Sequence, residues 1–255
     1  MSRPLLLLTN DDGIFAHGLR ALEEALQAVG EVVVVAPASE QSGVGRSITL
    51  RRPLRATPRG PGRWAVDGTP TDCVYLAVHH LLKRRPDLVI SGINRGPNLA
   101  DDVLYSGTVA GAMEAASVGL AAMAVSVVAH PPKDYEPAAD FARGVARWLL
   151  AHPLPSGRIL NVNVPDTDGA PVKGYRWTRG GRRDYRHRVT VSKDPRGREY
   201  YWLGGPLLHH FPVNGSDCDA TEEGFAALTP LGYDLTDHTL LERLDGTSIE
   251  GETDP

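Results

Sequence analysis

Short apolar runs alternate along the first 165 residues with segments in which apolar residues recur every three or four positions. The runs have the length and composition of strands buried on both faces of a sheet, and they lie at residues 5–8, 32–35, 87–91, 122–129 and 158–164. The segments between them have the spacing of amphipathic helices, at about residues 19–29, 69–82, 108–118 and 138–152. This alternation predicts an α/β fold whose mostly parallel sheet is covered by helices on both faces.

Local signals add detail to this outline. The sequence Thr69-Pro70-Thr71-Asp72 combines a hydroxyl cap with a proline in the first turn, which is typical of a helix start. Residues 47–54 and 63–66 are predicted to pair as a hairpin. Because the regular pattern ends at Pro165, we predict a core over residues 1–165 and a second region over residues 166–255.

The second region is polarised in charge. Residues 173–198 contain ten Lys or Arg and two acidic residues, whereas residues 214–255 contain eleven acidic residues and one Arg. We predict a β-hairpin arm over about residues 173–210, then a C-terminal segment with a flexible acidic tail. The basic stretch, which is rich in aromatic residues, could bind RNA. We favour oligomer assembly, in which this arm lies against an anionic surface of another subunit.

Composition argues against several classes of protein. The chain of 255 residues has 27 basic and 31 acidic side chains, a net charge of -4 that disfavours a stable nucleic-acid partner. The apolar runs are far shorter than the roughly 20 residues of a membrane helix, and no secretory signal is recognisable, so we expect a cytoplasmic protein without membrane association. The two cysteines, Cys73 and Cys218, predict neither a disulfide nor a metal site.

Two adjacent carboxylates, Asp11 and Asp12, directly follow the first predicted strand. Ligands bind at the carboxyl ends of strands in open α/β sheets, and adjacent like charges favour a cation between them. Hard oxygen ligands suit magnesium, manganese or calcium. Alternatively, the pair forms a solvated turn with Gly13.

Polar side chains also follow two other predicted strands. Ser42 lies after the second strand, and Asn94 and Asn98 lie after the third. Because parallel strands place these loops at one edge of the sheet, we expect their oxygen donors to lie near Asp11. The alternatives are that Ser42 is a turn hydroxyl and that the two asparagines adopt left-handed backbone among glycines.

The segment Ser106-Gly107-Thr108 begins a helix rich in small residues. Hydroxyls and backbone amides at a helix N-terminus can bind phosphate, although the same hydroxyls can simply cap the helix. The chain has no Walker motif, no Gly-x-Ser-x-Gly elbow and no zinc-type histidine spacing.

Together these motifs resemble the SurE family of 5'-nucleotidases, also called survival protein E. The matching motifs are Thr-Asn-Asp-Asp-Gly at 9–13, Ala-Pro-x-x-x-x-Ser-Gly at 36–43, Gly-Thr-Pro-x-Asp-Cys-Val at 68–74, Ser-Gly-Ile-Asn-Arg-Gly-Pro-Asn at 91–98 and Ser-Gly-Thr-Val-x-Gly-Ala at 106–112. They occur in one order, and the likeness continues to about residue 235.

The resemblance implies a Rossmann-like three-layer core and an enzyme that hydrolyses nucleoside 5'-monophosphates. It also implies a homodimer or homotetramer built through the hairpin arm and an exchanged C-terminal segment. By position, one divalent cation, Mg²⁺ or Mn²⁺, would be held by Asp11, Asp12, Ser42 and Asn94, with the two aspartates catalytic. The residues that would face the phosphate are Asn98, Ser106, Gly107 and Thr108.

Two other functions stay open on the residues alone. A phosphatase that forms an aspartyl-phosphate would use Asp11 as its nucleophile, but such enzymes usually carry a second Asp where this chain has Gly13. A phosphoreceiver-like signalling module also places paired acids after its first strand. It needs an acceptor Asp in the loop where this chain has Asn94.

Overall fold

The computed structural model describes residues 3–129, 131–167, 172–185, 188–204, 207–245 and 247. Its strands are β1 (Leu5–Thr9), β2 (Glu31–Pro37), β3 (Ala56–Pro58), β4 (Arg63–Val66), β5 (Leu88–Arg95), β6 (Ala122–Val128), β7 (Arg158–Pro165), β8 (Tyr175–Trp177), β9 (Arg182–Tyr185), β10 (Arg188–Lys193), β11 (Glu199–Gly204), β12 (Leu207–Phe211) and β13 (Ala226–Gly232). Its helices are α1 (His17–Leu26), α2 (Pro70–Leu76) with the π-helical turn η1 (Ala77–Leu81), the 3-10 helix η2 (Ala100–Leu104), α3 (Gly107–Ser117), α4 (Glu136–Ala151), α5 (Asp217–Glu222) and α6 (His238–Leu244).

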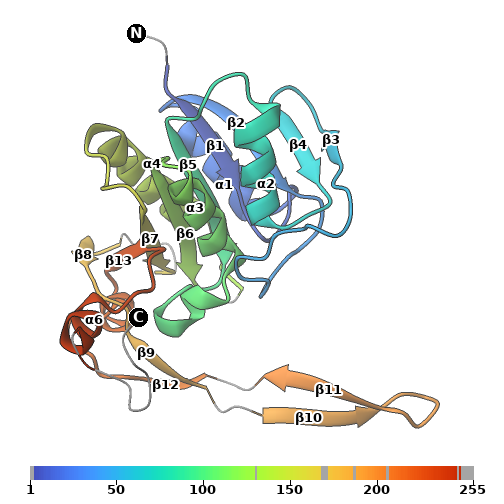
Figure 1. The fold of residues 1–255 in the computed structure, drawn as a ribbon, viewed down its shortest axis with the longest axis vertical. Helices are drawn as coiled ribbons and strands as arrows, with labels where there is room; N and C mark the ends of the chain where they lie inside the picture. The colour runs from blue at the N-terminus through green and yellow to red at the C-terminus, as the bar shows by residue number, and fades with distance from the viewer. Residues whose placement is uncertain are drawn as a thin grey trace.

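A nine-stranded sheet in the order β3-β4-β2-β1-β5-β6-β7-β13-β8 forms the centre of the molecule (Figure 1). Within this order, the adjacent strands β2, β1, β5, β6 and β7 run parallel to one another. Antiparallel pairs join β3 to β4 and β13 to β7. The predicted α/β fold with a mostly parallel sheet is therefore confirmed.

Helices cover both faces of this sheet and make three layers. Successive side chains of a strand point to opposite faces, so Leu6 and Leu8 pack with residues of α1 and α4. Leu5 and Leu7 pack with residues of α2 and α3 on the other face. Because β1 is buried on both faces, its end is a rigid place from which to present a polar loop.

The predicted helix start at Thr69 is confirmed, but the predicted hairpin is wrong in its first strand. The Thr69 side chain and the Asp72 carboxylate cap each other's backbone amides. The strand that pairs with β4 is β3, and residues 47–54 are not a strand. The backbone amide and hydroxyl of Thr49 donate instead to the Asp72 carboxylate, so this segment is tied to α2 rather than to the sheet.

The sheet continues beyond Pro165, where the sequence suggested that the core ends. Strand β8 pairs in parallel with β13, and the Thr178 amide donates to the Leu228 carbonyl at 3.0 Å. Residues 173–210 are therefore not one hairpin. Strand β8 belongs to the sheet, while β9 pairs with β12 and β10 pairs with β11.

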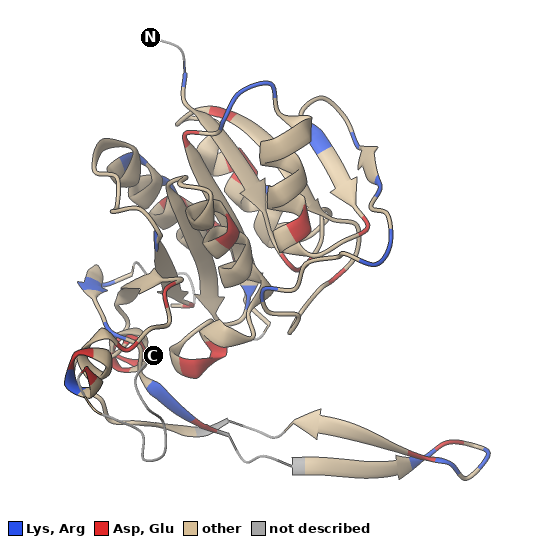
Figure 2. Ribbon diagram, in the orientation of Figure 1, with Lys and Arg blue, Asp and Glu red and all other residues tan. Residues whose placement is uncertain are grey.

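We call the β9–β12 pair the inner ribbon and the β10–β11 pair the outer ribbon. The outer ribbon projects away from the body of the molecule (Figure 1), and Figure 2 shows a group of charged residues at its far tip. The predicted acidic tail falls almost entirely outside the described residues. In the described chain, no helix is both long enough and apolar enough to cross a bilayer.

Candidate active site

Three loops meet at the carboxyl edge of the sheet, as the parallel order of β2, β1 and β5 predicts. The Gln41 amide donates to the Asp11 carbonyl at 2.7 Å and joins the loop after β2 to the loop after β1. The Arg95 amide donates to Oδ2 of Asp12 at 3.0 Å and joins the end of β5 to the same loop. Hydrogen bonds donated by two backbone amides thus hold the three segments together.

The carboxylate of Asp11 is buried at the centre of this junction, with the residue 4% exposed. The Thr108 amide donates to its Oδ2 at 3.1 Å, and the Thr108 hydroxyl donates to its Oδ1. Burial raises the pKa of Asp11 to about 6; the hydrogen bond from Thr108 opposes this rise, and the charge of Asp12 adds to it. The pair of carboxylates therefore favours a positively charged ligand.

Helix α3 starts directly against Asp11. A Cβ atom on Gly107 would lie 2.8 Å from Cβ of Asp11, so only glycine allows this close approach without displacing the carboxylate. The hydroxyl of Ser106 accepts from the Val109 amide at 3.0 Å and caps the helix. The N-terminal end of α3, with its partial positive charge, thus faces the buried carboxylate.

Ser42 reaches the site from the loop after β2, and Asn94 reaches it from the end of β5. Nδ2 of Asn94 donates to the Gly96 carbonyl at 2.8 Å, which leaves its Oδ1 as the side-chain atom suited to a cation. The Ser42 hydroxyl donates to Glu40 at 2.8 Å. Both side chains therefore offer neutral oxygen atoms in defined orientations.

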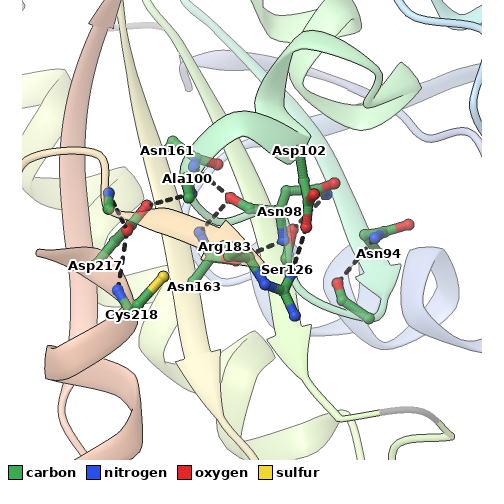
Figure 3. Close-up of polar contacts among 12 residues, drawn as sticks. Asn94, Asn98, Ala100, Asp102, Ser126, Asn161, Asn163, Arg183, Asp217 and Cys218 are labelled. Atoms are coloured by element: carbon green, nitrogen blue, oxygen red, sulfur yellow. Dashed lines mark hydrogen bonds and ion pairs between the residues drawn. The ribbon is translucent and has the colours of Figure 1, made fainter. Parts of the chain in front are cut away.

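Asn98 is held by a polar network behind the loop (Figure 3). Its Nδ2 donates to Ser126 at 2.8 Å, and its backbone amide donates to Asn163 at 2.9 Å. Its carbonyl accepts from Asn161 at 2.8 Å and from Asn163 at 3.0 Å. These contacts fix the loop rigidly at the ends of β6 and β7.

One cavity of about 630 Å³ opens over this junction. The predicted site residues that line it are Asp11, Ser42, Asn94, Asn98 and Ser106. The other three are not lining residues: Asp12 contacts the end of β5, and Gly107 and Thr108 contact Asp11. Thr108 therefore touches the carboxylate rather than the cavity.

The cavity also contains residues that sequence reasoning missed. Arg95 lines it from the end of β5, Tyr105 from the position just before Ser106, and Asp102 from η2. Arg183 lines it from β9, although it lies 81 positions from its ion-pair partner Asp102. In the sequence Arg183 is one member of a basic run, and nothing local distinguishes it from its neighbours.

Comparison with known proteins identifies the family of this chain. The model of the family described as "Survival protein SurE" matches residues 6–187, which contain all three loops, α3 and Arg183. The chain belongs to the SurE family.

Curated SurE relatives match nearly the whole chain. The 5'-nucleotidase SurE of Anaeromyxobacter dehalogenans (strain 2CP-C) is 51% identical over 249 residues, which cover 96% of each chain. The 5'-nucleotidase SurE of Myxococcus xanthus (strain DK1622) is 49% identical over 248 residues, covering 96% of this chain and 94% of that relative. The crystal structure of the SurE protein from Aquifex aeolicus superposes with a TM-score of 0.84 at 40% identity, covering 94% of this chain and 98% of that one.

The site of this SurE-family chain suits a hard cation. The described residues contain no cluster of three or more His, Cys, Asp or Glu that could hold a metal. The donors at the loop junction are instead two carboxylates, one amide oxygen and one hydroxyl, from Asp11, Asp12, Asn94 and Ser42. Such oxygen donors match the preference of Mg²⁺ and Mn²⁺, and two negative charges match one divalent ion.

Proposed function

We propose that this SurE-family protein is a divalent-metal-dependent 5'-nucleotidase that hydrolyses nucleoside 5'-monophosphates to nucleoside and phosphate. The observation that carries the proposal is the buried Asp11 carboxylate beside Asp12, at the junction of three loops and under a cavity of about 630 Å³. The names of the relatives from Myxococcus and Anaeromyxobacter support the same activity.

One divalent cation per subunit, Mg²⁺ or Mn²⁺, would be held by Asp11, Asp12, Ser42 and Asn94. When bound, such an ion neutralises phosphoryl charge and lowers the pKa of a water molecule. Two carboxylates balance its charge, and the neutral oxygens of Ser42 and Asn94 add ligands without adding charge. Thr108 holds the Asp11 carboxylate in place through both of its oxygen atoms.

The phosphate of the substrate would lie between Asn98 and the start of α3. Ser106 lines the cavity there, and the N-terminal turn of the helix favours negative charge. Gly107 keeps this turn against Asp11, so the phosphate-binding and metal-binding groups stay close together. The attacking water forms the new bond to phosphorus as the ester bond breaks, and the nucleoside leaves with a proton on its 5'-oxygen.

Phosphate release from AMP tests this function directly. Purified protein with Mn²⁺ is expected to release phosphate and adenosine in equal amounts, and a chelator should lower the rate to background. Restoring Mn²⁺ or Mg²⁺ should restore the rate. Protein that releases no phosphate from any nucleoside monophosphate, with either metal, would contradict the proposal.

Attack by Asp11 itself predicts a different result. A phosphoaspartate would be trapped by denaturing the protein during turnover, whereas attack by water leaves no phosphorylated protein. We expect none, because both oxygens of Asp11 already accept hydrogen bonds from Thr108.

We further propose that the protein is a cytoplasmic homodimer or homotetramer assembled through the outer ribbon. This ribbon carries exposed apolar side chains, among them Val189, Trp202 and Leu203, which are 57%, 66% and 83% exposed. Large apolar side chains gathered on a projecting element are typical of a protein interface. A second copy of the chain would cover them.

A further inference from the structure

The wall of the cavity facing the inner ribbon is formed by Arg183 of β9. Its side chain is only 9% exposed, whereas its neighbour Arg182 is exposed. Nη1 of Arg183 donates to Oδ2 of Asp102, a residue of η2 (Figure 3). The inner ribbon therefore contributes one buried, positively charged side chain to a cavity whose other lining residues belong to the core.

The carboxylate of Asp217 fixes both sides of this contact. Its Oδ2 accepts from the Ala100 amide at 2.9 Å, at the start of η2. Its Oδ1 accepts from the Gly181 amide at 2.8 Å, just before β9. Asp217 is 1% exposed, so one buried side chain sets the distance between the segments that carry Asp102 and Arg183 (Figure 3).

The arrangement of charges indicates what Arg183 faces. Asp11 and Asp102 both line the cavity, and a single divalent cation would balance only the Asp11–Asp12 pair. A phosphate monoester brings further negative charge and needs another cation. Arg95 also lines the cavity, but its side chain is 45% exposed and is screened by water, whereas the buried guanidinium of Arg183 is not.

We propose that Arg183 is a phosphate-binding residue of this site, positioned by Asp102 and contributed by the inner ribbon. The proposal rests on the proposed nucleotidase function and adds to it one direct contact with the substrate. A guanidinium presents several N–H groups in a planar fork, so it can hold Asp102 with one edge and a phosphoryl oxygen with another. Asp102 also balances the buried charge before the substrate arrives.

Asp102 connects this contact to the start of α3 as well. Its carbonyl accepts from the Tyr105 amide at 3.0 Å and from the Ser106 amide at 3.1 Å. The residue that orients Arg183 through its side chain therefore supports the phosphate-facing turn through its backbone. Because Asp102 supports both residues, Arg183 and Ser106 would contact the same phosphate group.

The test compares three variants with a matched control in the full-length protein with Mn²⁺. Binding of inorganic phosphate is measured by titration calorimetry, and kcat and KM are measured with AMP. Arg183→Ala should weaken phosphate binding roughly 10- to 100-fold, the range for a hydrogen bond to a charged group. Arg183→Lys should fall between this variant and the wild type, because an ammonium keeps the charge but loses the planar fork.

Arg182→Ala is the control. Arg182 is the neighbour of Arg183 on β9, and its guanidinium lies 4.9 Å from the ring centroid of Phe211, on the opposite face of the strand. Its loss should leave phosphate binding and KM within about threefold of the wild type, as for a surface charge.

Asp102→Ala separates phosphate binding from a purely structural ion pair. If Arg183 binds phosphate, Arg183→Ala should weaken phosphate binding much more than Asp102→Ala does. The KM for AMP should likewise rise more in Arg183→Ala than in Asp102→Ala. Equal losses in the two variants, or wild-type phosphate affinity in Arg183→Ala, would overturn the proposal. Should Arg183→Ala fail to fold, wild-type affinity and KM in Arg183→Lys would overturn it.

The two proposals fail in distinguishable ways. Protein that releases no phosphate from AMP overturns the nucleotidase function, and the calorimetric titration then still decides whether Arg183 binds phosphate. Protein that hydrolyses AMP with the same KM in Arg183→Ala as in the wild type overturns only the role of Arg183.

Discussion

Strands β5 and β11 have similar lengths but opposite environments. The first six residues of β5 are buried, and the strand ends where Asn94 and Arg95 enter the site. Every residue of β11 is exposed, including Tyr201 and Trp202. Strand β5 thus buries its apolar residues within one chain. The outer ribbon leaves its apolar residues for another surface, which is why we assign it to assembly.

The inner ribbon lies between these extremes. Gly181 binds the buried carboxylate of Asp217 and Arg183 binds the half-buried carboxylate of Asp102, so this part of the chain is docked on the core. His210 of β12 contacts Asp219 of α5 at 2.9 Å, which adds a second link. We therefore propose a division by role, in which the core and the inner ribbon form the site and the outer ribbon carries the assembly surface.

The largest effect should come from the carboxylates of the core. Asp11→Asn and Asp12→Asn should each lower kcat by at least about 10²-fold, because each removes a charge needed where phosphoryl charge develops. Steady-state hydrolysis of AMP measures the loss, and circular dichroism checks the fold. Asp101→Asn, which changes an exposed residue of η2 outside the cavity lining, is the matched control. Near-normal turnover in both site variants would refute the assignment.

A methyl group at Gly107 should disturb the site without removing any functional group. The new Cβ would meet Cβ of Asp11 at 2.8 Å, so the carboxylate or the helix start must move. We expect Gly107→Ala to lower kcat about 10-fold and to reduce the free energy of unfolding by about 1–3 kcal/mol.

The same change elsewhere in the core provides the control for Gly107. Gly144 lies within α4, where an added Cβ meets nothing within 4 Å. Gly144→Ala should leave kcat unchanged and increase the free energy of unfolding by about 0.5–1 kcal/mol, since alanine favours the helix. If both variants behave alike in denaturant unfolding and AMP hydrolysis, then close packing against Asp11 is not the reason that position 107 needs glycine.

Changes in the outer ribbon should alter assembly more than catalysis. Leu203→Glu places a charge on a side chain that is 83% exposed in a single chain, so it should dissociate the oligomer on gel filtration without unfolding the subunit. We expect kcat to stay within about threefold of the wild type, because this ribbon contributes no residue to the cavity lining. An oligomer that survives this change and a matching one at Trp202 would show that the ribbon does not form the interface.

The smallest expected change is in the reactivity of two buried thiols, Cys73 in the core and Cys218 beside the inner ribbon. Burial raises the pKa of Cys218 to about 12, and the charge of Asp217 adds to this rise. Burial raises the pKa of Cys73 well above its usual value. A raised pKa keeps a thiol protonated and unreactive, so neither should react with a thiol reagent at about pH 8 until denaturant is added. Rapid labelling of the folded protein would show that these sites open readily.

Sequence reasoning predicted the part of the site that depends on local pattern. Apolar runs identify β1, β2 and β5 as parallel strands, and parallel strands must bring the residues after them to one edge. Asp11, Ser42 and Asn94 meet in the cavity for that reason. Their proposed roles as metal ligands come from chemistry and family resemblance, and they stay predictions.

Sequence reasoning failed where contacts between distant segments decide the structure. Residues 47–54 have strand-like composition, but the capping carboxylate Asp72 satisfies the polar groups of Thr49. Strand β8 resembles the rest of the basic arm, yet pairing with β13 draws it into the sheet. Arg183 could not be distinguished within a basic run, because its burial depends on how β9 docks against η2.

We propose that Asp11, Asp12, Ser42 and Asn94 together hold a divalent cation where the segments after β1, β2 and β5 meet. The most direct test is an anomalous difference map from crystals grown with Mn²⁺. We expect one strong peak per subunit, in contact with both aspartates and with the oxygen atoms of Ser42 and Asn94. A peak elsewhere in the cavity, or no peak at this junction in crystals of active enzyme, would contradict it.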